Sequence, residues 1–413
     1  MKMEIMAPVG DFETLQSAIK AGTDSVYFGI GDLNMRSRAA INFTIDDLKE
    51  VVRICKENKV KTYLALNIVL YDDDLVEMKA TCDAAKEAGI SAMICSDFAA
   101  IEYAKSIGLE VHVSTQANVS NLEAVKFFSK YVDVAVLARE LSMEQIKEIC
   151  EQIKKQKIKG PSGNLIEIEI FVHGALCVSI SGKCYMSLAN YNSSANRGAC
   201  FQPCRRAYKV IDEETGDELK VDNKYVMSPK DLCTIGFLDR IVDSGVKVLK
   251  IEGRGRKAEY VYNVVKVYKE ALKAIEEGNY NKENIEKWTK ELEKVYNRGF
   301  WHGGYYLGKK LGEWSGAYGS QATTEKVYVG KGVHYFGKKK VAHFLIESDE
   351  LKIGDSVIIT GPTTGYVEFK VTEMKVEDKK VEKAVKGNNV TFPLNEKIRE
   401  NDKLFVVRKR NEK

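Results

Sequence analysis

The stretch MEIMAPVGDFETLQSAIKAGTDSVYFG, residues 3–29, contains one complete unit of the fold that the sequence predicts. It opens with the apolar run Met3–Ala7, continues through a segment of helical periodicity, and closes with the run Ser25–Gly29, rich in β-forming residues. Two short strands joined by a crossover helix become parallel strands of one sheet. The stretch therefore predicts a strand–helix–strand unit at the start of an α/β domain.

The same alternation continues along the chain to about residue 252, with helical stretches such as SMEQIKEICEQIKK between the strand-like runs. The predicted strands are Met3–Ala7, Ser25–Gly29, Lys61–Leu66, Ala92–Ser96, Glu110–Ser114, Val134–Ala138, Ile166–Val172 and Val246–Ile251. Eight such units in about 250 residues favour a closed (β/α)8 TIM-type barrel. An open doubly wound sheet is the alternative, but no GxGxxG motif follows the first strand.

One connection departs from this repeat. Between the seventh and eighth predicted strands, the insertion Gly174–Gly245 replaces the usual helix. It contains a cysteine-rich segment, a hairpin-like stretch over Tyr208–Ser228 and a predicted helix over Asp231–Gly245. Long connections of this kind commonly carry function. Two amphipathic helices, over Lys257–Glu277 and Asn281–Tyr296, are expected to complete the barrel domain.

A second, smaller domain is expected after the barrel. The chain is rich in Gly, Tyr and Trp from Asn297 to Gly319, and short alternating strands dominate from Glu325 onward. We therefore expect a catalytic barrel domain over residues 1–320 and a C-terminal β-barrel over residues 325–413. The smaller domain has 19 Lys and Arg against 14 Asp and Glu. This basic excess fits either a solvated lysine-rich surface or an accessory domain that contacts RNA.

The composition of the 413 residues narrows the functional classes. The 63 Lys and Arg nearly balance the 59 Asp and Glu, which excludes a protein that coats polyanions with its whole surface. No apolar run approaches the roughly 20 residues that a membrane-spanning helix needs. The N-terminal MKMEIMAPVGDFETL has acidic residues where a signal peptide needs a continuous apolar stretch. We expect a cytoplasmic protein.

The cysteines fall into two groups. Four lie within apolar helical or strand patterns and are expected in the core; these are Cys55, Cys82, Cys95 and Cys150. Five gather in the insertion among Gly, Ser and Asn; these are Cys177, Cys184, Cys200, Cys204 and Cys233. In a reducing compartment such a group indicates metal binding rather than disulfides. Four soft thiolate ligands select zinc or an iron–sulfur cluster, and their spacing does not separate the two.

Side chains just beyond the strand ends form the catalytic face of a TIM-type barrel. Here Glu169 and His173 lead into the cysteine-rich segment, and a dense polar set follows the other strands. That set is Asn34, Arg36, Arg38, Asn67, Asp97, Thr115, Gln116, Asn118, Arg139, Glu140, Glu252, Arg254 and Arg256. Because guanidinium groups bind carboxylate or phosphate through paired hydrogen bonds, the arginines predict a small anionic substrate. Taken singly, each residue also fits a solvated loop or an internal ion pair.

His173 is the histidine expected at the catalytic face, whereas His112 lies inside the fifth predicted strand and is expected to fill the barrel interior. An acid–base role and a structural role both fit His173. The chain has no HExxH pair and no GxSxG motif, which removes zincin-type and serine-hydrolase sites. A cysteine peptidase using Cys177 and His173 is the remaining peptidase interpretation, although four neighbouring thiols are an unusual setting for one nucleophile.

The segment EIFVHGALCVSISGKCYMS, residues 169–187, closely resembles the signature of the collagenase-like U-32 peptidase family. The resemblance extends from residue 1 to about residue 310 through stretches such as HVSTQANVSN and YNRGFWHGGYYLG, and the C-terminal module is similar to a β-barrel found in the same family. The family name records a collagenase activity. Several members are nevertheless implicated in oxygen-independent hydroxylation of the tRNA wobble uridine, of a ribosomal RNA cytidine or of a ubiquinone precursor.

The resemblance implies a [4Fe-4S] cluster, and prephenate as the co-substrate of RNA-modifying members. Carried onto this chain, the cluster ligands would be Cys177, Cys184, Cys200 and Cys204, with Cys233 as the alternate fourth ligand. Overall length, the Cys200–Cys204 pair and the C-terminal module look most like the tRNA-hydroxylating members. Where relatives usually read EGRMK, this chain reads EGRGR at residues 252–256, which changes details of the pocket.

The function implied by this resemblance is conversion of the wobble uridine of tRNA to 5-hydroxyuridine. The expected proton-handling residues are His173, Glu252 and Glu169. The expected substrate-binding residues are Arg36, Arg38, Asn67, Gln116, Arg139, Arg254 and Arg256. Three alternatives remain: a collagenase-like peptidase, a hydroxylase of ribosomal RNA or another substrate, and a non-catalytic RNA-binding protein with structural zinc.

Overall fold

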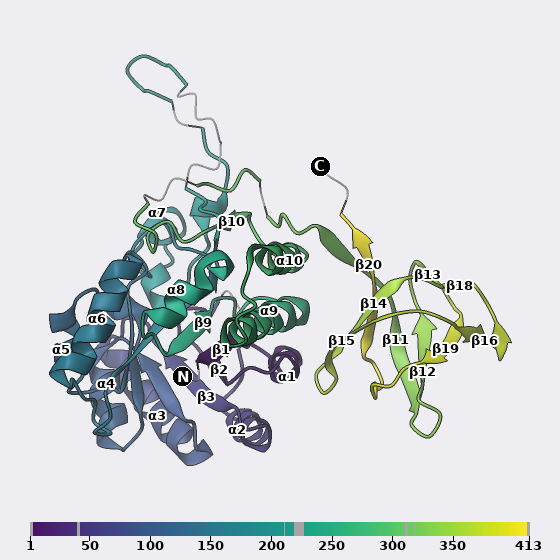
Figure 1. Ribbon diagram of the computed structural model, residues 1–413, viewed down its shortest axis with the longest axis horizontal. Helices are drawn as coiled ribbons and strands as arrows, with labels where there is room; N and C mark the ends of the chain where they lie inside the picture. The colour runs from purple at the N-terminus through teal and green to yellow at the C-terminus, as the bar shows by residue number, and fades with distance from the viewer. Residues whose placement is uncertain are drawn as a thin grey trace.

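The computed structural model describes residues 3–38, 42–209, 211–218, 227–309, 313–317 and 319–410. Its larger part is a closed barrel of eight parallel strands (Figure 1). The ring closes because β9 pairs in parallel with both β1 and β7. These strands are β1 (Glu4–Pro8), β2 (Ser25–Phe28), β3 (Lys61–Leu66), β4 (Ala92–Cys95), β5 (Val111–Val113), β6 (Val134–Val136), β7 (Glu167–Gly174) and β9 (Val248–Ile251). The predicted TIM-type barrel is confirmed, and the open sheet is excluded.

Helices follow the strands and cover the barrel (Figure 1). Local signals set several of their ends: Asp11 and Ser142 form capping boxes at the starts of α1 and α6, and Gly89 ends α3 in the left-handed conformation. None of the described helices combines the length and apolar composition of a membrane span. The helices are α1 (Phe12–Lys20), α2 (Leu48–Glu57), α3 (Leu75–Ala88), α4 (Phe98–Ser106), α5 (Leu122–Phe128), α6 (Met143–Gln156), α8 (Leu238–Asp243), α9 (Ala258–Glu276) and α10 (Lys282–Glu293).

Two further strands lie beside the barrel: β8 (Asp231–Cys233), in the insertion between β7 and β9, and β10 (Phe300–Trp301), which follows α10. The predicted helix over residues 231–245 is therefore wrong in its first part, because α8 begins only at Leu238. Strand β8 pairs antiparallel with the end of β7, and Asp231 forms a buried ion pair with Arg298 at 3.2 Å. These partners are distant in sequence, so local periodicity could not predict them. The predicted hairpin is described only in part: Ile211 bridges Glu218, and residues 219–226 lie outside the described ranges.

The C-terminal region is β-rich, which confirms the predicted change of architecture. An eight-stranded antiparallel sheet has the order β15-β14-β20-β11-β12-β19-β16-β17, and β13 pairs with β18. Its core is made of buried side chains such as Phe344, Phe392 and Ile359. The strands are β11 (Thr324–Phe336), β12 (Val341–Ile346), β13 (Glu350–Lys352), β14 (Ser356–Gly361), β15 (Gly365–Lys370), β16 (Lys375–Val376), β17 (Lys379–Lys380), β18 (Lys383–Val385), β19 (Asn389–Pro393) and β20 (Lys403–Lys409).

The β-rich region packs against the side of the barrel formed by α1 and α9 (Figure 1). Tyr262 of α9 stacks on Tyr366 of β15 with ring centroids 4.6 Å apart, and Lys326 pairs with Glu259 at 2.7 Å. Gly365 lies so close to the backbone of α1 that a Cβ atom there would come within 3.0 Å of it. These contacts anchor the β-rich region to helices α1 and α9 of the barrel domain.

Candidate functional site

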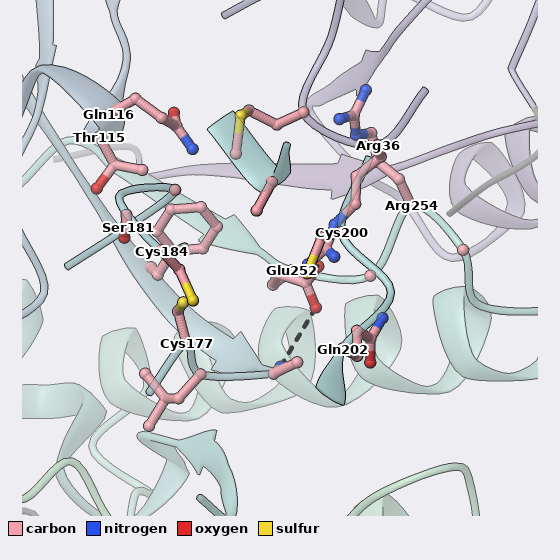
Figure 2. Close-up of a pocket in the computed structure, with 18 of the residues that line it drawn as sticks. Arg36, Thr115, Gln116, Cys177, Ser181, Cys184, Cys200, Gln202, Glu252 and Arg254 are labelled. Atoms are coloured by element: carbon pink, nitrogen blue, oxygen red, sulfur yellow. Dashed lines mark hydrogen bonds and ion pairs between the residues drawn. The ribbon is translucent and has the colours of Figure 1, made fainter. Parts of the chain in front are cut away.

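A cavity of about 390 Å³ opens at the carboxyl ends of the barrel strands, where TIM-type barrels hold their active sites. Strands β2, β3, β4, β7 and β9 contribute side chains to its wall. The loops after β5 and β6 add Gln116 and Arg139, and the cysteine-rich segment completes the lining (Figure 2). The insertion and the barrel therefore build one site together.

Four cysteines of the insertion line this cavity: Cys177, Cys184, Cys200 and Cys204. All four are free thiols of intermediate exposure, and Figure 2 shows the first three pointing into the pocket. Short elements set their positions: the helix α7 (Met186–Tyr191) and a 3₁₀ turn at Ala195–Arg197 lie between Cys184 and Cys200, and a second 3₁₀ turn, Pro203–Arg205, contains Cys204. The four cysteines that the family resemblance selects as ligands are thus brought to the same cavity.

The thiols lie close enough to influence one another. The pKa of Cys204 is raised to about 11, chiefly by burial, which Arg205 opposes and the charges of the other three thiols reinforce. Burial also raises the pKa of Cys177, but hydrogen bonding to Ser179 and the positive charge of Arg139 lower it by more, so its net pKa lies below the usual value. The Cys177 thiol therefore ionises more readily than an ordinary cysteine.

Sulfur donors in this number suit a soft metal group. Among the described residues, no three His, Cys, Asp or Glu side chains are already placed to bind one ion. The donor set nevertheless fits zinc or an iron–sulfur cluster in kind, because four unpaired thiols surround one space and none is committed to a disulfide. To bind such a group, the four thiols would have to converge further.

Cys233, the alternate fourth ligand, is not brought to this cavity. It lies in β8 with its side chain fully buried in the hydrophobic core of the barrel domain. Burial raises its pKa to about 12, as expected for a thiol among apolar neighbours. The geometry therefore favours Cys177, Cys184, Cys200 and Cys204 over any set that includes Cys233.

Basic side chains dominate the charge of the cavity. Seven cations line it, together with a single acidic residue, Glu252. Three of the cations have carboxylate partners within 3.2 Å: Arg36 with Glu252, Lys250 with Glu169, and Arg298 with Asp231. The remaining cations, for which no carboxylate partner occurs among the described residues, are Arg139, Arg205, Arg254 and Arg256. This excess of positive charge makes the cavity a site for an anion.

Glu252 is held as a carboxylate. Burial raises its pKa, but the charges of Arg36 and Arg256 lower it by more, so the net pKa lies below the usual value. Its Oε1 accepts a hydrogen bond from Arg36 at 2.8 Å, and its Oε2 accepts a longer one from the backbone N–H of Ala175 at 3.3 Å. Glu252 therefore sits in the cavity as a proton acceptor beside the cysteine-rich segment.

The predicted substrate-binding residues mostly meet at this cavity. Those that line it are Arg36, Asn67, Gln116, Arg139, Arg254 and Arg256. Asn67 donates to Gln116 at 3.1 Å, and Arg254 donates to the buried Asn34 at 3.0 Å. Arg38 is the exception, because its side chain is exposed and does not line the cavity. It was placed in the site only because it follows a barrel strand, and the loop carries it away.

His173 is also placed differently from its prediction. Phe171 and Ala175 line the cavity, but a register shift in the pairing of β7 with β9 lies between Phe171 and His173. Such a bulge moves the following side chain to the other face of the sheet. The buried His173 ring consequently packs against Tyr260 and Tyr268 of α9, and burial lowers its pKa to about 3. His173 does not form a catalytic pair with Cys177.

Glu169 lies below the cavity rather than on its surface. Its side chain is fully buried inside the barrel, where Oε1 binds Lys250 at 2.7 Å and Oε2 lies 3.4 Å from His112 Nδ1. Lys250 lines the cavity, and its ammonium group also lies 4.5 Å from the ring centre of Tyr27. Glu169 is therefore a positioning residue that fixes Lys250 under the site.

Three basic residues of the cavity were not predicted from the sequence. Lys250 is a charged residue within an apolar strand, Arg205 directly follows Cys204, and Arg298 begins the glycine-rich stretch after α10. Arg205 donates hydrogen bonds to the carbonyl oxygens of Pro229 at 2.6 Å and of Leu176, so it ties together two parts of the insertion. Of these three, only Lys250 had a signal in the sequence, because a lone lysine inside an apolar barrel strand indicates a functional or paired charge.

Gly198 packs the cysteine-rich segment against Asn34 and Ser37 of the loop after β2, and its substitution tests that contact. Its φ is +82°, and a Cβ atom would overlap the carbonyl oxygen of Asn34 and Ser37 Oγ. We expect Gly198→Ala to lower the free energy of unfolding by about 1–3 kcal/mol, measured by denaturant titration. Gly216 is the matched control, since its φ is +74° but nothing lies within 4 Å of the added atom. If Gly216→Ala lowers the free energy of unfolding by the same amount, the loss in Gly198→Ala comes from backbone strain and not from the contact with Asn34 and Ser37.

Comparison with known proteins identifies the family of this chain. The family model described as peptidase family U32 matches residues 10–316. A collagenase of Porphyromonas gingivalis is 56% identical over 409 residues, with 99% of both chains covered. A tRNA hydroxylation protein of Bacillus subtilis is 34% identical over 304 residues, which cover 72% of this chain and 69% of that protein.

A third relative, a 23S rRNA 5-hydroxycytidine synthase of Escherichia coli, is 32% identical over 308 residues, which cover 72% of this chain and 44% of that protein. The family match contains the barrel strands from β2 to β9 and the whole cysteine-rich segment. Relatives with peptidase and RNA-hydroxylation names are thus similar to this chain over at least 72% of its length. The chain belongs to peptidase family U32.

Proposed function

We propose that this protein is a cytoplasmic RNA-modifying enzyme that hydroxylates the wobble uridine of tRNA to 5-hydroxyuridine without molecular oxygen. The proposal includes a [4Fe-4S] cluster on Cys177, Cys184, Cys200 and Cys204, and prephenate as co-substrate. One observation carries it: four free thiols and an excess of arginine line the same cavity. The 34% identity to a tRNA hydroxylation protein supports the choice of substrate.

The residues of the cavity suggest a division of tasks. Prephenate carries two carboxylates, and Arg139, Arg205, Arg254 and Arg256 would bind them through charge-assisted hydrogen bonds. A bound iron–sulfur cluster would supply electron transfer or coordinate the substrate. Glu252 would accept or return a proton at Oε2, the oxygen that Arg36 does not hold.

The test combines cells and purified protein. Deletion of the gene is expected to remove 5-hydroxyuridine from tRNA nucleosides analysed by mass spectrometry, and the plasmid-borne gene should restore it. Protein purified without oxygen is expected to be brown and to contain iron. An unchanged 5-hydroxyuridine pool would reject the substrate, whereas a colourless protein with stoichiometric zinc would reject the redox mechanism.

A peptidase acting on collagen-like chains is the second candidate, because the relative named collagenase is 56% identical. In this structure the ring of His173 lies on the other side of β7 from the cavity, so it cannot activate Cys177. A peptidase mechanism would need a different base. Cleavage of gelatin by the purified protein, abolished in a folded Cys177→Ala variant, would support the peptidase function. Cleavage by the Cys177→Ala variant would rule out that thiol as the nucleophile.

Arg256 offers a specific test of the carboxylate site. Its guanidinium stacks on Tyr296 at 3.5 Å from the ring centre and has no carboxylate partner among the described residues. We expect Arg256→Gln to raise the KM for prephenate roughly 10- to 100-fold, the range of one lost charge-assisted hydrogen bond. Arg256→Lys keeps the charge but loses the paired donors, so its KM for prephenate should lie between those of the wild type and of Arg256→Gln. An unchanged KM in Arg256→Gln would remove this residue from the co-substrate site.

A further inference from the structure

We propose that a surface at the mouth of the cavity binds unpaired nucleotides, with their bases stacked on exposed aromatic rings and their phosphates on neighbouring basic side chains. This aromatic rim consists of Tyr185, Tyr191, Phe201, Lys183 and Arg206. The inference rests on the proposed function and deepens it, because it specifies single-stranded RNA rather than duplex as the substrate form.

The exposure of the rings is the first observation. The side chains of Tyr185, Phe201 and Tyr191 are 70%, 53% and 40% exposed. Of the 17 large apolar side chains exposed in the described part of the chain, five lie between residues 180 and 201. Water disfavours such a cluster, so it indicates a surface that a partner covers.

The rings also lie beside the cavity. Tyr185 is flanked by Cys184 and Met186, and Phe201 by Cys200 and Gln202, and all four flanking residues line the cavity. The rings of Tyr191 and Phe201 are 5.4 Å apart. A nucleotide chain stacked on these rings would therefore place a neighbouring base next to the cysteines and to Glu252.

The charge of the segment selects the partner. Residues 175–209 contain five Lys and Arg and no Asp or Glu, although the whole chain is nearly balanced. Lys183 and Arg206 are exposed and have no carboxylate partner among the described residues. The Arg206 guanidinium lies 5.2 Å from the ring centre of Tyr191, so a cation and a stacking surface stand together. Proteins recognise single-stranded RNA through this pairing of positive charge with aromatic faces.

A collagen-like peptide is the competing occupant, since proline rings also pack on aromatic side chains. Such a peptide has no regular negative charge to pair with Lys183 and Arg206. A double helix carries the charge, but its bases are already stacked on one another and cannot cover the rings. Unpaired RNA satisfies both features of the rim, and the other two ligands serve as comparisons.

The experiment measures binding to the full-length protein by fluorescence anisotropy. The probes are an RNA hairpin with a single-stranded loop, a fully paired duplex of the same length, and a collagen-like Gly-Pro-rich peptide. We expect the hairpin to bind more tightly than the other two. Tyr185→Ala and Phe201→Ala should each weaken hairpin binding roughly 5- to 100-fold, the range found for loss of one stacked base. Tyr185→Phe should keep most of the affinity, because it keeps the ring.

Phe127→Ala is the matched control, because Phe127 is 46% exposed but lies at the far end of α5, outside the rim. Arg206→Gln should weaken hairpin binding and reduce its salt dependence by about one ion. Equal binding of hairpin and duplex, an unaffected Tyr185→Ala, or preference for the peptide would each overturn the inference. Anisotropy measures binding and does not require catalysis, so the two proposals can fail separately. If the rim variants bind normally but gene deletion removes 5-hydroxyuridine from tRNA, only the inference about the rim is rejected. If gene deletion leaves 5-hydroxyuridine unchanged, the proposed function itself is rejected.

Discussion

A Cys200→Ser variant purified without oxygen is expected to lose its iron and its hydroxylation activity together. Cys200 lines the cavity with the other three thiols, on the side of Glu252 (Figure 2), and a serine hydroxyl is a much harder ligand than a thiolate. Even substitutions of residues that only support a metal ligand weaken binding by about 10- to 100-fold, so loss of a ligand should cost at least that much. Iron content, visible absorption and tRNA nucleosides measure the effect.

Cys233→Ala is the paired experiment for the ligand set. The Cys233 side chain lies in the hydrophobic core and does not line the cavity, so this variant should retain iron even if its stability falls. Iron loss in Cys233→Ala with iron retention in Cys200→Ser would replace the proposed set by one that includes Cys233. Retention of iron in both, with full activity, would place the cluster elsewhere.

The barrel was predictable because its strands are short apolar runs and the crossover helices have a different period. Each predicted strand overlaps an observed one, and Lys61–Leu66 agrees with β3 at both ends. The same topology explains why most of the residues that line the cavity could be predicted. Since parallel strands present their carboxyl ends at one face, residues as distant as Arg36 and Glu252 could be expected together, and they form an ion pair at 2.8 Å.

The failures have a common physical origin in long-range pairing. The bulge that turns His173 away from the cavity depends on the register between β7 and β9, which are about 75 residues apart in sequence. Strand β8 exists because β7 and β10 pair with it, not because of its own period. Arg38 and Cys233 were included by sequence position, and position along the chain does not decide which side of a loop or sheet a side chain faces.

Glu169→Gln is expected to be strongly destabilising, because it leaves two buried cations without their common partner. Glu169 is fully buried, Lys250 binds it at 2.7 Å from β9, and His112 approaches it at 3.4 Å from β5. Removal of one member of a buried ion pair typically costs about 3–5 kcal/mol. Denaturant titration at pH 6 measures the loss. Glu87→Gln, which breaks the exposed Lys49–Glu87 pair, is the control and should leave the free energy of unfolding almost unchanged.

The loss in Glu169→Gln should depend on pH in a defined way. Burial raises the pKa of Glu169, but Lys250 and His112 lower it by more, so its net pKa is lowered and its contribution to stability disappears as the pH falls below about 4.5. Burial lowers the pKa of His112, but Glu110 and Glu169 raise it by more, so its contribution disappears as the pH rises through a value above 6.5. The difference between wild type and variant should therefore be largest near pH 5–6 and smaller on both sides. A difference that stays constant from pH 4 to pH 9 would mean that the cost comes from packing and not from charge.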